Sequence, residues 1–172
     1  MKRIYRILAL LLVIALVPLL SSCNKNASEG TKGVVTTEKT QNDVYQTDLL
    51  SVEVPKGWKA LPQPDKVDSA HIYKGDKDAY DSPAVVIYYC DQDTEMLSPR
   101  GLYPDAEDLA PVKIGDYTWE GFTAISAGYP ITVLSVKEPH QLQVQLFNEV
   151  GGQKISLEDD DVQAIIRSIS IK

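Results

Sequence analysis

The stretch Gln141-Leu-Gln-Val-Gln-Leu-Phe147 alternates between polar and apolar side chains along its whole length. Successive side chains of a β-strand point to opposite faces of the sheet, so Leu142, Val144 and Leu146 point one way and the glutamines the other. This period is typical of a strand that is buried on one face only. A β-sheet is therefore the starting point for reading the rest of the chain.

The same two-residue period recurs on the N-terminal side of this stretch. Gly, Pro and Asp residues that favour turns separate the segments. Ala84-Val-Val-Ile-Tyr-Tyr-Cys90 is apolar on both alternations, which predicts a central strand with both faces covered. We predict strands at 44–49, 51–54, 70–74, 83–90, 112–115, 117–126 and 131–137, in addition to 141–147.

A helical period replaces this pattern near the C-terminus. Ser156 is the predicted N-cap, with Asp159 three residues on. Sheet first and helix last predicts an α+β domain over 44–172, an antiparallel β-sheet meander with a C-terminal helix packed on the sheet. The apolar stripe of this helix has the i, i+3, i+4, i+7 spacing and consists of Val162, Ile165, Ile166 and Ile169.

The acidic run Glu158-Asp-Asp-Asp161 overlaps the start of this segment. The helix dipole favours acidic side chains in the first turn and a basic one, here Arg167, in the last turn. Four adjacent acids also have the composition of a metal cluster. We favour the helix start over the metal cluster.

Residues 1–22 differ from the rest of the chain. Lys2, Arg3 and Arg6 precede an apolar run from Ile7 to Leu20, and no acidic residue is present. This is the order of a secretory signal peptide. As a helix, the run of about 14 residues would span roughly 21 Å, short of the ~30 Å hydrocarbon core, which disfavours a permanent transmembrane helix.

The sequence Leu20-Ser21-Ser22-Cys23 follows this run and closely resembles the lipobox of bacterial lipoproteins. The resemblance implies that the Cys23 thiol receives diacylglycerol, that a dedicated peptidase cuts just before it, and that the new amino terminus is often N-acylated. Two acyl chains make membrane attachment stable. We therefore expect a lipid-anchored protein on the extracytoplasmic face of the bacterial cell membrane, with residues 1–22 removed. The alternative is an incidental cysteine near an ordinary cleavage site.

Residues 24–43 are polar and have no apolar stripe. Such a segment cannot offset its ordering entropy by burial, so 23–43 is expected to form the lipidated Cys23 and a flexible tether. The whole chain of 172 residues has 24 acidic and 17 basic side chains and a net charge of −7, and removing the basic signal makes it more acidic. Such a charge disfavours nucleic-acid binding.

Three segments of the predicted domain resemble the PsbP-like superfamily, which includes the Mog-type proteins. They are Val54-Pro-Lys-Gly-Trp58, Ile114-Gly-Asp-Tyr-Thr-Trp-Glu-Gly-Phe122 and Ile166-Arg-Ser-Ile-Ser170. The resemblance implies an α/β/α sandwich, an antiparallel sheet with helices packed against its faces. Pro62 and Pro64 depart from the pattern, because they interrupt the stretch that often holds a first helix in that superfamily. Functions there are diverse, so the resemblance implies a fold and no activity.

The long segment from Asp91 to Pro111 separates two predicted strands and has Arg100 as its only basic residue. Connections of this length tend to be functional or mobile. Asp91-x-Asp93-x-Glu95 has the spacing that begins a calcium loop, but it lacks the following glycine and the distal glutamate. A solvated connection is the favoured interpretation, ahead of a binding loop for a partner or peptide and ahead of calcium. The candidate binding residues are Asp91, Asp93, Glu95, Asp105, Glu107 and Asp108.

The sequence contains no recognisable catalytic constellation. Ser126 lacks the first glycine of a nucleophile elbow, and His71 and His140 have no second histidine at metal spacing. With Cys23 lipidated, Cys90 has no partner for an internal disulfide, and a packed thiol is favoured over a reactive one. No metal and no cofactor are expected beyond the covalent diacylglycerol and N-acyl lipid.

These features predict a membrane-anchored, extracytoplasmic lipoprotein that acts without catalysis, as a binding or accessory module of the cell envelope. Its expected partners are the membrane, reached through the lipid anchor, and an envelope protein. The alternatives are a solute or metal receptor, or an enzyme, that uses a cleft near 91–111. A purely structural spacer is a third alternative.

Overall fold

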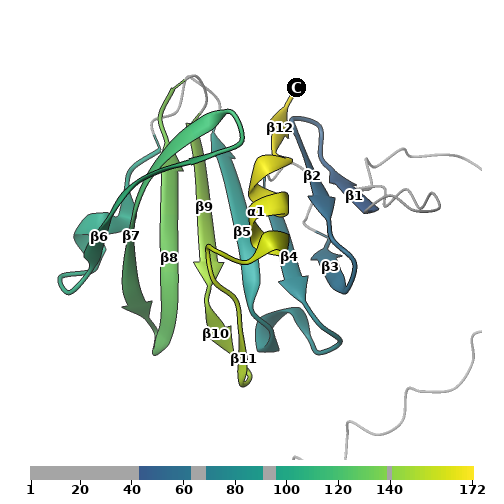
Figure 1. Ribbon diagram of the computed structural model, residues 1–172, viewed down its shortest axis with the longest axis horizontal. Helices are drawn as coiled ribbons and strands as arrows, with labels where there is room; N and C mark the ends of the chain where they lie inside the picture. Colours follow the sequence, from purple (N-terminus) through teal and green to yellow (C-terminus); the bar gives the residue numbers. More distant parts are fainter. Residues whose placement is uncertain (1–42, 63–68, 91–95, 139–140) are drawn as a thin grey trace, which may run out of the picture.

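The computed structural model describes residues 43–62, 69–90, 96–138 and 141–172. A seven-stranded antiparallel sheet forms most of the molecule, with strand order β3-β4-β5-β9-β8-β7-β6 (Figure 1). Its strands are β3 Trp58–Leu61, β4 Ser69–Lys74, β5 Ala84–Cys90, β6 Glu107–Ile114, β7 Tyr117–Ser126, β8 Tyr129–Val136 and β9 Gln141–Phe147.

The order of these strands shows that the chain makes two meanders and not the single one predicted. Strands β3 to β5 are neighbours in sequence and in the sheet, and so are β6 to β9. The two meanders join where β5 pairs with β9, from Ala84 opposite Phe147 to Cys90 opposite Gln141. The connection from β5 to β6 therefore runs from an interior strand to the far edge of the sheet.

The remaining elements are short. A second sheet has the order β1-β2-β12, made of Asp43–Gln46, Leu50–Val54 and Ser170–Ile171. The helix α1, Asp160–Arg167, lies on the face of the large sheet that is nearest the viewer in Figure 1, beside the second sheet. A small hairpin, β10 Glu149–Val150 and β11 Gln153–Lys154, and two 3-10 helices, η1 Ala79–Asp81 and η2 Pro99–Leu102, complete the fold.

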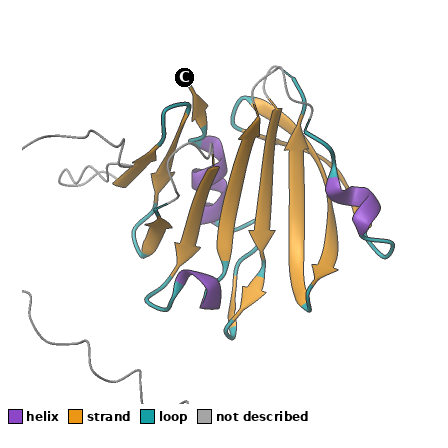
Figure 2. Cartoon of the chain, turned by 180° about the vertical axis from the view of Figure 1, so that it is seen from behind, coloured by secondary structure: helices purple, strands orange, loops and turns teal. Residues whose placement is uncertain are grey.

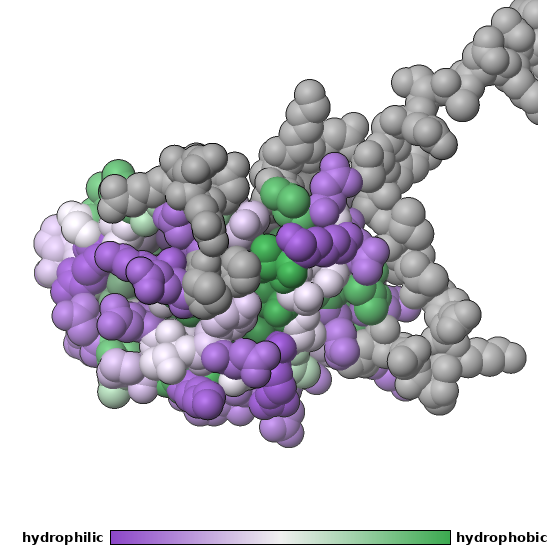
Figure 3. Space-filling model, turned by 90° about the horizontal axis from the view of Figure 1, so that it is seen from above, coloured by the Kyte–Doolittle hydropathy of each residue, from purple (hydrophilic) through white to green (hydrophobic). Residues whose placement is uncertain are grey.

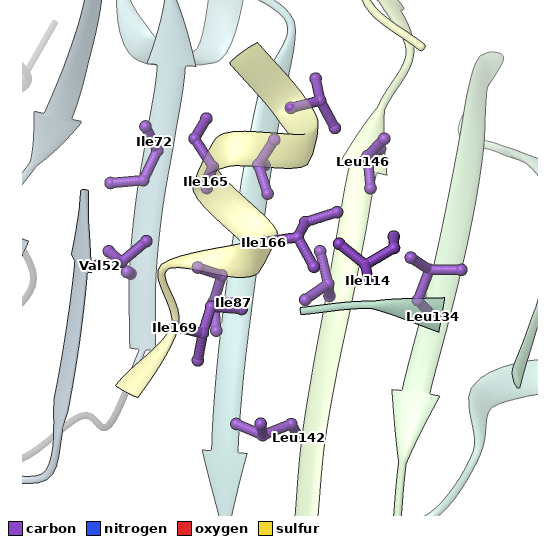
Figure 4. Packing of buried hydrophobic residues seen from close by; sticks show 14 of the residues in the cluster. Val52, Ile72, Ile87, Ile114, Leu134, Leu142, Leu146, Ile165, Ile166 and Ile169 are labelled. Atoms are coloured by element: carbon purple, nitrogen blue, oxygen red, sulfur yellow. The ribbon is translucent and has the colours of Figure 1, made fainter. Parts of the chain in front are cut away.

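The main core lies between α1 and the large sheet. Leu142, Val144 and Leu146 are fully buried there while the intervening glutamines are partly exposed, which confirms the alternation read from the sequence. The predicted stripe of α1 faces them, and Figure 4 shows Ile165, Ile166 and Ile169 among the side chains of both sheets. Burying one such side chain contributes about 1.5–3 kcal/mol.

The interior strand β5 is covered on both faces in its first half only. All residues from Ala84 to Ile87 are buried, whereas Tyr88 is exposed and Cys90 is half-buried. A smaller cluster of Phe122, Ile131 and Val133 lies apart from the main core, and Tyr103 and Ala106 pack against it. The β5–β6 connection thus covers part of the second face.

The expected α+β domain of the α/β/α sandwich type is wrong: the protein is mostly β, with a single short α-helix in the described ranges. The segment after Trp58 forms strand β3 instead of a first helix, paired with β4 from Trp58–Lys74 to Leu61–His71. Strand pairing satisfies its backbone groups and buries the indole of Trp58. In the described part of the chain, the sheet face opposite α1 carries the 3-10 helices η1 and η2 and no α-helix (Figure 2).

The predicted helix cap was wrong by three residues. The N-cap of α1 is Asp159, whose side chain makes no capping hydrogen bond. The carboxylate of Asp159 instead accepts from the backbone N–H of Ser156 at 3.1 Å and from its hydroxyl at 3.2 Å. These contacts close a turn before the helix. The first helical turn holds Asp160 and Asp161 and the last holds Arg167, which confirms the helix-start interpretation of the acidic run.

Candidate functional site

An open groove of about 550 Å³ lies where the β5–β6 connection meets the β7–β8 hairpin. One wall is the segment that follows η2 and enters β6, and the other is the end of the hairpin. The residues that line it are Leu102, Tyr103, Pro104, Asp105, Ala106, Glu107, Thr123, Ala124, Ile125, Ser126, Ala127 and Pro130. Both walls lie at the β6–β7 edge of the large sheet, which is farthest from β1 in Figure 1.

The groove exists because β7 is longer than the part of it that β6 covers. Pairing between the two strands begins at Glu107 opposite Thr123 and ends at Ile114 opposite Tyr117. The last residues of β7, Ala124 to Ser126, pair only with β8, from Ala124–Ile131 to Ser126–Tyr129. The chain before Glu107 turns away from this end of β7 and leaves the groove between them.

Arg100 fixes the shape of the first wall. Its guanidinium donates to Asp108 Oδ1 at 2.7 Å and to the carbonyl oxygens of Tyr103 at 2.9 Å and Ala106 at 2.7 Å. The same group lies 5.8 Å from the centroid of the Phe122 ring. Charge-assisted hydrogen bonds of this kind are stronger than neutral ones, so one side chain holds both ends of the turn that enters β6.

Tyr103 links the two walls. Its ring packs against Phe122 with centroids 5.9 Å apart, and its hydroxyl donates to Ser126 Oγ at 3.1 Å. Because alternate side chains share a face, Phe122 and Ser126 lie on the face of β7 opposite to Ile125. Tyr103 therefore closes one side of the groove, and the Ile125 side stays open.

The β7–β8 turn forms the rim of the second wall. Ala127 and Gly128 both have positive φ, +50° and +87°, as in the two-residue turns that match the twist of a hairpin. Ala127 is the one non-glycine residue with positive φ in the described ranges. This conformation costs an L-residue about 1–2 kcal/mol, and such costs are often found at functional sites.

The structure separates the candidate acidic residues. Asp105 and Glu107 line the groove, whereas Asp108, on β6, is ion-paired to Arg100. Asp91, Asp93 and Glu95 lie outside the described residues, as do Cys23 and His140. The predicted loop to Pro111 was too long, because β6 already begins at Glu107. Within the described ranges, no three or more Asp, Glu, His or Cys side chains are grouped so as to hold a metal ion.

One exposed apolar side chain of the groove, Ile125, was not predicted. Ile125, near the end of β7, is 64% exposed, and Leu102, at the end of η2, is 77% exposed. The available signal was the length of the alternating segment 117–126 relative to its predicted partner 112–115. A strand that is longer than its partner has an unpaired end. Whether a third strand covers that end depends on the strand order.

Ser126 and His71, which the sequence offered as candidates for chemistry, lie far apart. Ser126, on β7, and His71, on β4, are four strand positions apart, which is about 19 Å at ~4.8 Å per strand. Cys90 is a free, half-buried thiol at the end of β5. Burial lowers the pKa of His71, whose imidazole makes edge contacts with the rings of Tyr73 and Tyr80.

Comparison with known proteins identified no family, since no family model and no curated protein matches the chain. Several solved structures resemble it weakly, among them the following two. One is LpqN of Mycobacterium tuberculosis, described as involved in cell envelope biogenesis, with 16% identity, a TM-score of 0.38, and coverage of 71% of this chain and 82% of LpqN. The other, from Bacteroides thetaiotaomicron VPI-5482, has 15% identity, a TM-score of 0.38, and coverage of 72% of this chain and 45% of the other. Likenesses at this level assign neither a family nor an activity to the chain.

Proposed function

We propose that this protein is a noncatalytic binding module of the bacterial cell envelope, anchored by lipid on Cys23 and binding its partner in the groove between η2 and the β7–β8 hairpin. The observation that carries the binding role is the groove itself, in which exposed apolar side chains lie beside carboxylates. The lipobox sequence supports the anchor. The separation of Ser126 from His71 supports a role without nucleophilic catalysis.

The arrangement of the molecule suits an anchored binder. The described chain begins at Asp43 on β1, and the groove lies at the opposite end of the large sheet (Figure 1). A tether that enters at β1 leaves this end of the domain accessible. Within the described residues, no helix has the length and apolar character needed to cross a bilayer.

The anchor is tested by replacing the cysteine that would carry it. The full chain is expressed in a bacterium that processes lipoproteins, as wild type, Cys23→Ala and Cys90→Ala, and is labelled with an alkyne fatty acid. Cys90→Ala is the matched control, because these are the only two cysteines in the chain. We expect Cys23→Ala alone to lose the label and to leave the Triton-extractable lipoprotein fraction. Undiminished label on Cys23→Ala contradicts the anchor.

The binding role is tested in cells by placing photoactivatable benzoylphenylalanine in place of Ile125. The control position is Tyr80, which is also exposed but lies on η1, away from the groove. We expect a discrete crosslinked species of constant mass from position 125 and none from position 80. Equal crosslinking at both positions, or none at 125, contradicts the groove as the binding site.

A further inference from the structure

We propose that the groove binds an extended, basic segment of a partner protein, which adds as a strand to the free edge of β7 at Ala124–Ser126. This inference rests on the proposed function and names the kind of ligand that the groove takes. The juxtaposition that carries it is an unpaired strand edge, an apolar side chain and two carboxylates in one open groove.

The free edge supplies main-chain hydrogen bonds. Ala124, Ile125 and Ser126 pair with β8 on one side, and β6 starts too late to pair with them on the other. Backbone groups of successive strand residues point to alternate sides, so at least one of these three directs its N–H and C=O into the groove. In the described ranges, no hydrogen bond from a loop or turn reaches the backbone of these residues. An incoming strand would satisfy them, which is the basis of β-strand addition.

The side chains of the groove select an apolar residue next to a basic one. Ile125 and Glu107 lie on the same face of the sheet, because Glu107 is opposite Thr123 and Ile125 is two residues on. A strand beside β7 therefore places one side chain against Ile125 and the next one on that face near Glu107. Leu102 and Asp105 extend the apolar and the acidic parts of the opposite wall.

Among the described residues, no basic side chain lines the groove to neutralise its charge. Its lining contains Asp105 and Glu107 and no lysine or arginine. Neither carboxylate forms an ion pair with a described residue, whereas the nearby Arg100 is held by Asp108. Lysine or arginine in the ligand is the complement of these carboxylates.

A second copy of the chain is the less suitable occupant. Its own groove carries the same two carboxylates, so edge-to-edge pairing would bring like charges together, and the whole chain has a net charge of −7. Seen from above, the described surface is mostly hydrophilic or intermediate, with a hydrophobic band near its middle and smaller hydrophobic areas elsewhere (Figure 3). The site is also preorganised by Arg100 and Tyr103, which lowers the ordering cost of binding a flexible segment.

The test uses the full-length mature protein in detergent micelles and a fluorescent peptide of alternating lysine and valine. We expect saturable binding, and amide hydrogen exchange that slows at 124–126 when the peptide is added. The same peptide with glutamate in place of lysine should bind at least about tenfold more weakly. A version N-methylated at alternate residues, which cannot donate along one edge, should lose binding. The last two comparisons change only the ligand, so a folding defect cannot mimic them.

Variants of the protein locate the site. Asp105→Asn with Glu107→Gln should weaken binding about three- to tenfold and reduce its salt dependence, since each exposed pair contributes little and is screened by salt. Asp76→Asn is the matched control, because Asp76 is an exposed carboxylate paired to Lys59 on the opposite edge strand. Equal loss from the control and the double variant would overturn the assignment.

Three other results would overturn the proposal. These are equal affinity for the lysine and glutamate peptides, tolerance of N-methylation, and protection of 124–126 that depends on protein concentration without peptide, which indicates a second copy. If the lysine–valine peptide does not bind while benzoylphenylalanine at position 125 still crosslinks a partner, the strand-addition proposal is wrong and the proposed binding role is retained. If neither binding nor crosslinking is observed, both proposals are wrong.

Discussion

At the scale of single residues, His71 links protonation to folding. Its imidazole is partly buried on β4 between the rings of Tyr73 and Tyr80, and its Nε2 is buried without a hydrogen-bond partner among the described residues. Burial lowers the pKa of His71 below its usual 6.5, and a hydrogen bond with the backbone of Ala79 acts in the opposite direction. The neutral imidazole is therefore the form that the folded protein favours.

This lowered pKa predicts a loss of stability in mild acid. The unfolded chain takes up the proton as pH falls through about 6.5, before the folded protein does. The contribution of neutral His71 to the free energy of unfolding is thus present above that pH and declines below it. We expect Tm to fall more between pH 7.5 and pH 5.5 for wild type than for His71→Gln, as measured by circular dichroism. Parallel Tm profiles for the two proteins would contradict this coupling.

Arg100 shows how much of the site the sequence indicates at this scale. Its position as the only base in an acidic segment was visible, but its partners were not. Two of the three acceptors are the carbonyl oxygens of Tyr103 and Ala106, which carry no sequence signal because every residue has one. The third, Asp108, is one of six candidate acids that composition alone did not distinguish.

At the scale of elements, β8 lies so close to Gly121 of β7 that no side chain fits there. A Cβ built there would meet the carbonyl oxygen of Val133 and would lie 2.8 Å from Leu134 Cδ2. Both belong to β8, which forms the second wall of the groove with β7. The glycine is required by this close approach and not by its backbone angles.

Gly121→Ala should therefore destabilise the protein by about 1–3 kcal/mol, the usual cost of overpacking a core. Gly101→Ala is the matched control, because a Cβ at Gly101 would meet no heavy atom within 4 Å. Urea unfolding followed by tryptophan fluorescence measures both. A Gly121→Ala protein as stable as the Gly101→Ala protein would show that the two strands separate without cost.

The helix α1 illustrates what local patterns predict well. Its stripe and its charged turns were visible in the sequence, and the buried residues are Val162, Ile165 and Ile166. An isolated helix of this length is unstable in water, so α1 persists because it packs on both sheets. The N-cap at Asp159 was missed because the Asp159 carboxylate makes no capping bond. It accepts hydrogen bonds from Ser156 instead, in a turn that precedes the helix.

At the scale of the whole molecule, the C-terminus completes the second sheet. Strand β12 pairs with β2 at Ser170–Ser51 and Ile171–Leu50. The backbone N–H of Lys172 donates to Leu49 at 3.0 Å, and its Nζ donates to Thr47 at 2.8 Å. The last residues of the chain thus hold the β1–β2 hairpin, where the proposed tether enters.

Removal of residues 170–172 should destabilise the protein by about 2 kcal/mol, since several hydrogen bonds of ~0.5–1.5 kcal/mol each are lost. Amide exchange should rise in β1 and β2 and stay unchanged in the β7–β8 hairpin. Lys172→Ala, which keeps the backbone pairing, is the control and should have a small effect. If exchange rose equally over the whole large sheet, the second sheet would not be the part of the protein that residues 170–172 stabilise.

The sequence by itself determined where most strands and the helix lie and which of their faces are apolar, because a period of two or 3.6 residues is a local property of the chain. The lipobox expectation for Cys23 likewise depends on adjacent residues alone. Only the tertiary structure decided that β5 pairs with β9, which sends the acidic connection to the far edge of the sheet. The register of β6 on β7 then sets Glu107 opposite Thr123, two residues from Ile125, and leaves the groove at the end of β7. Strand order depends on contacts between residues far apart in the chain, and alternation within a strand carries no information about its neighbour.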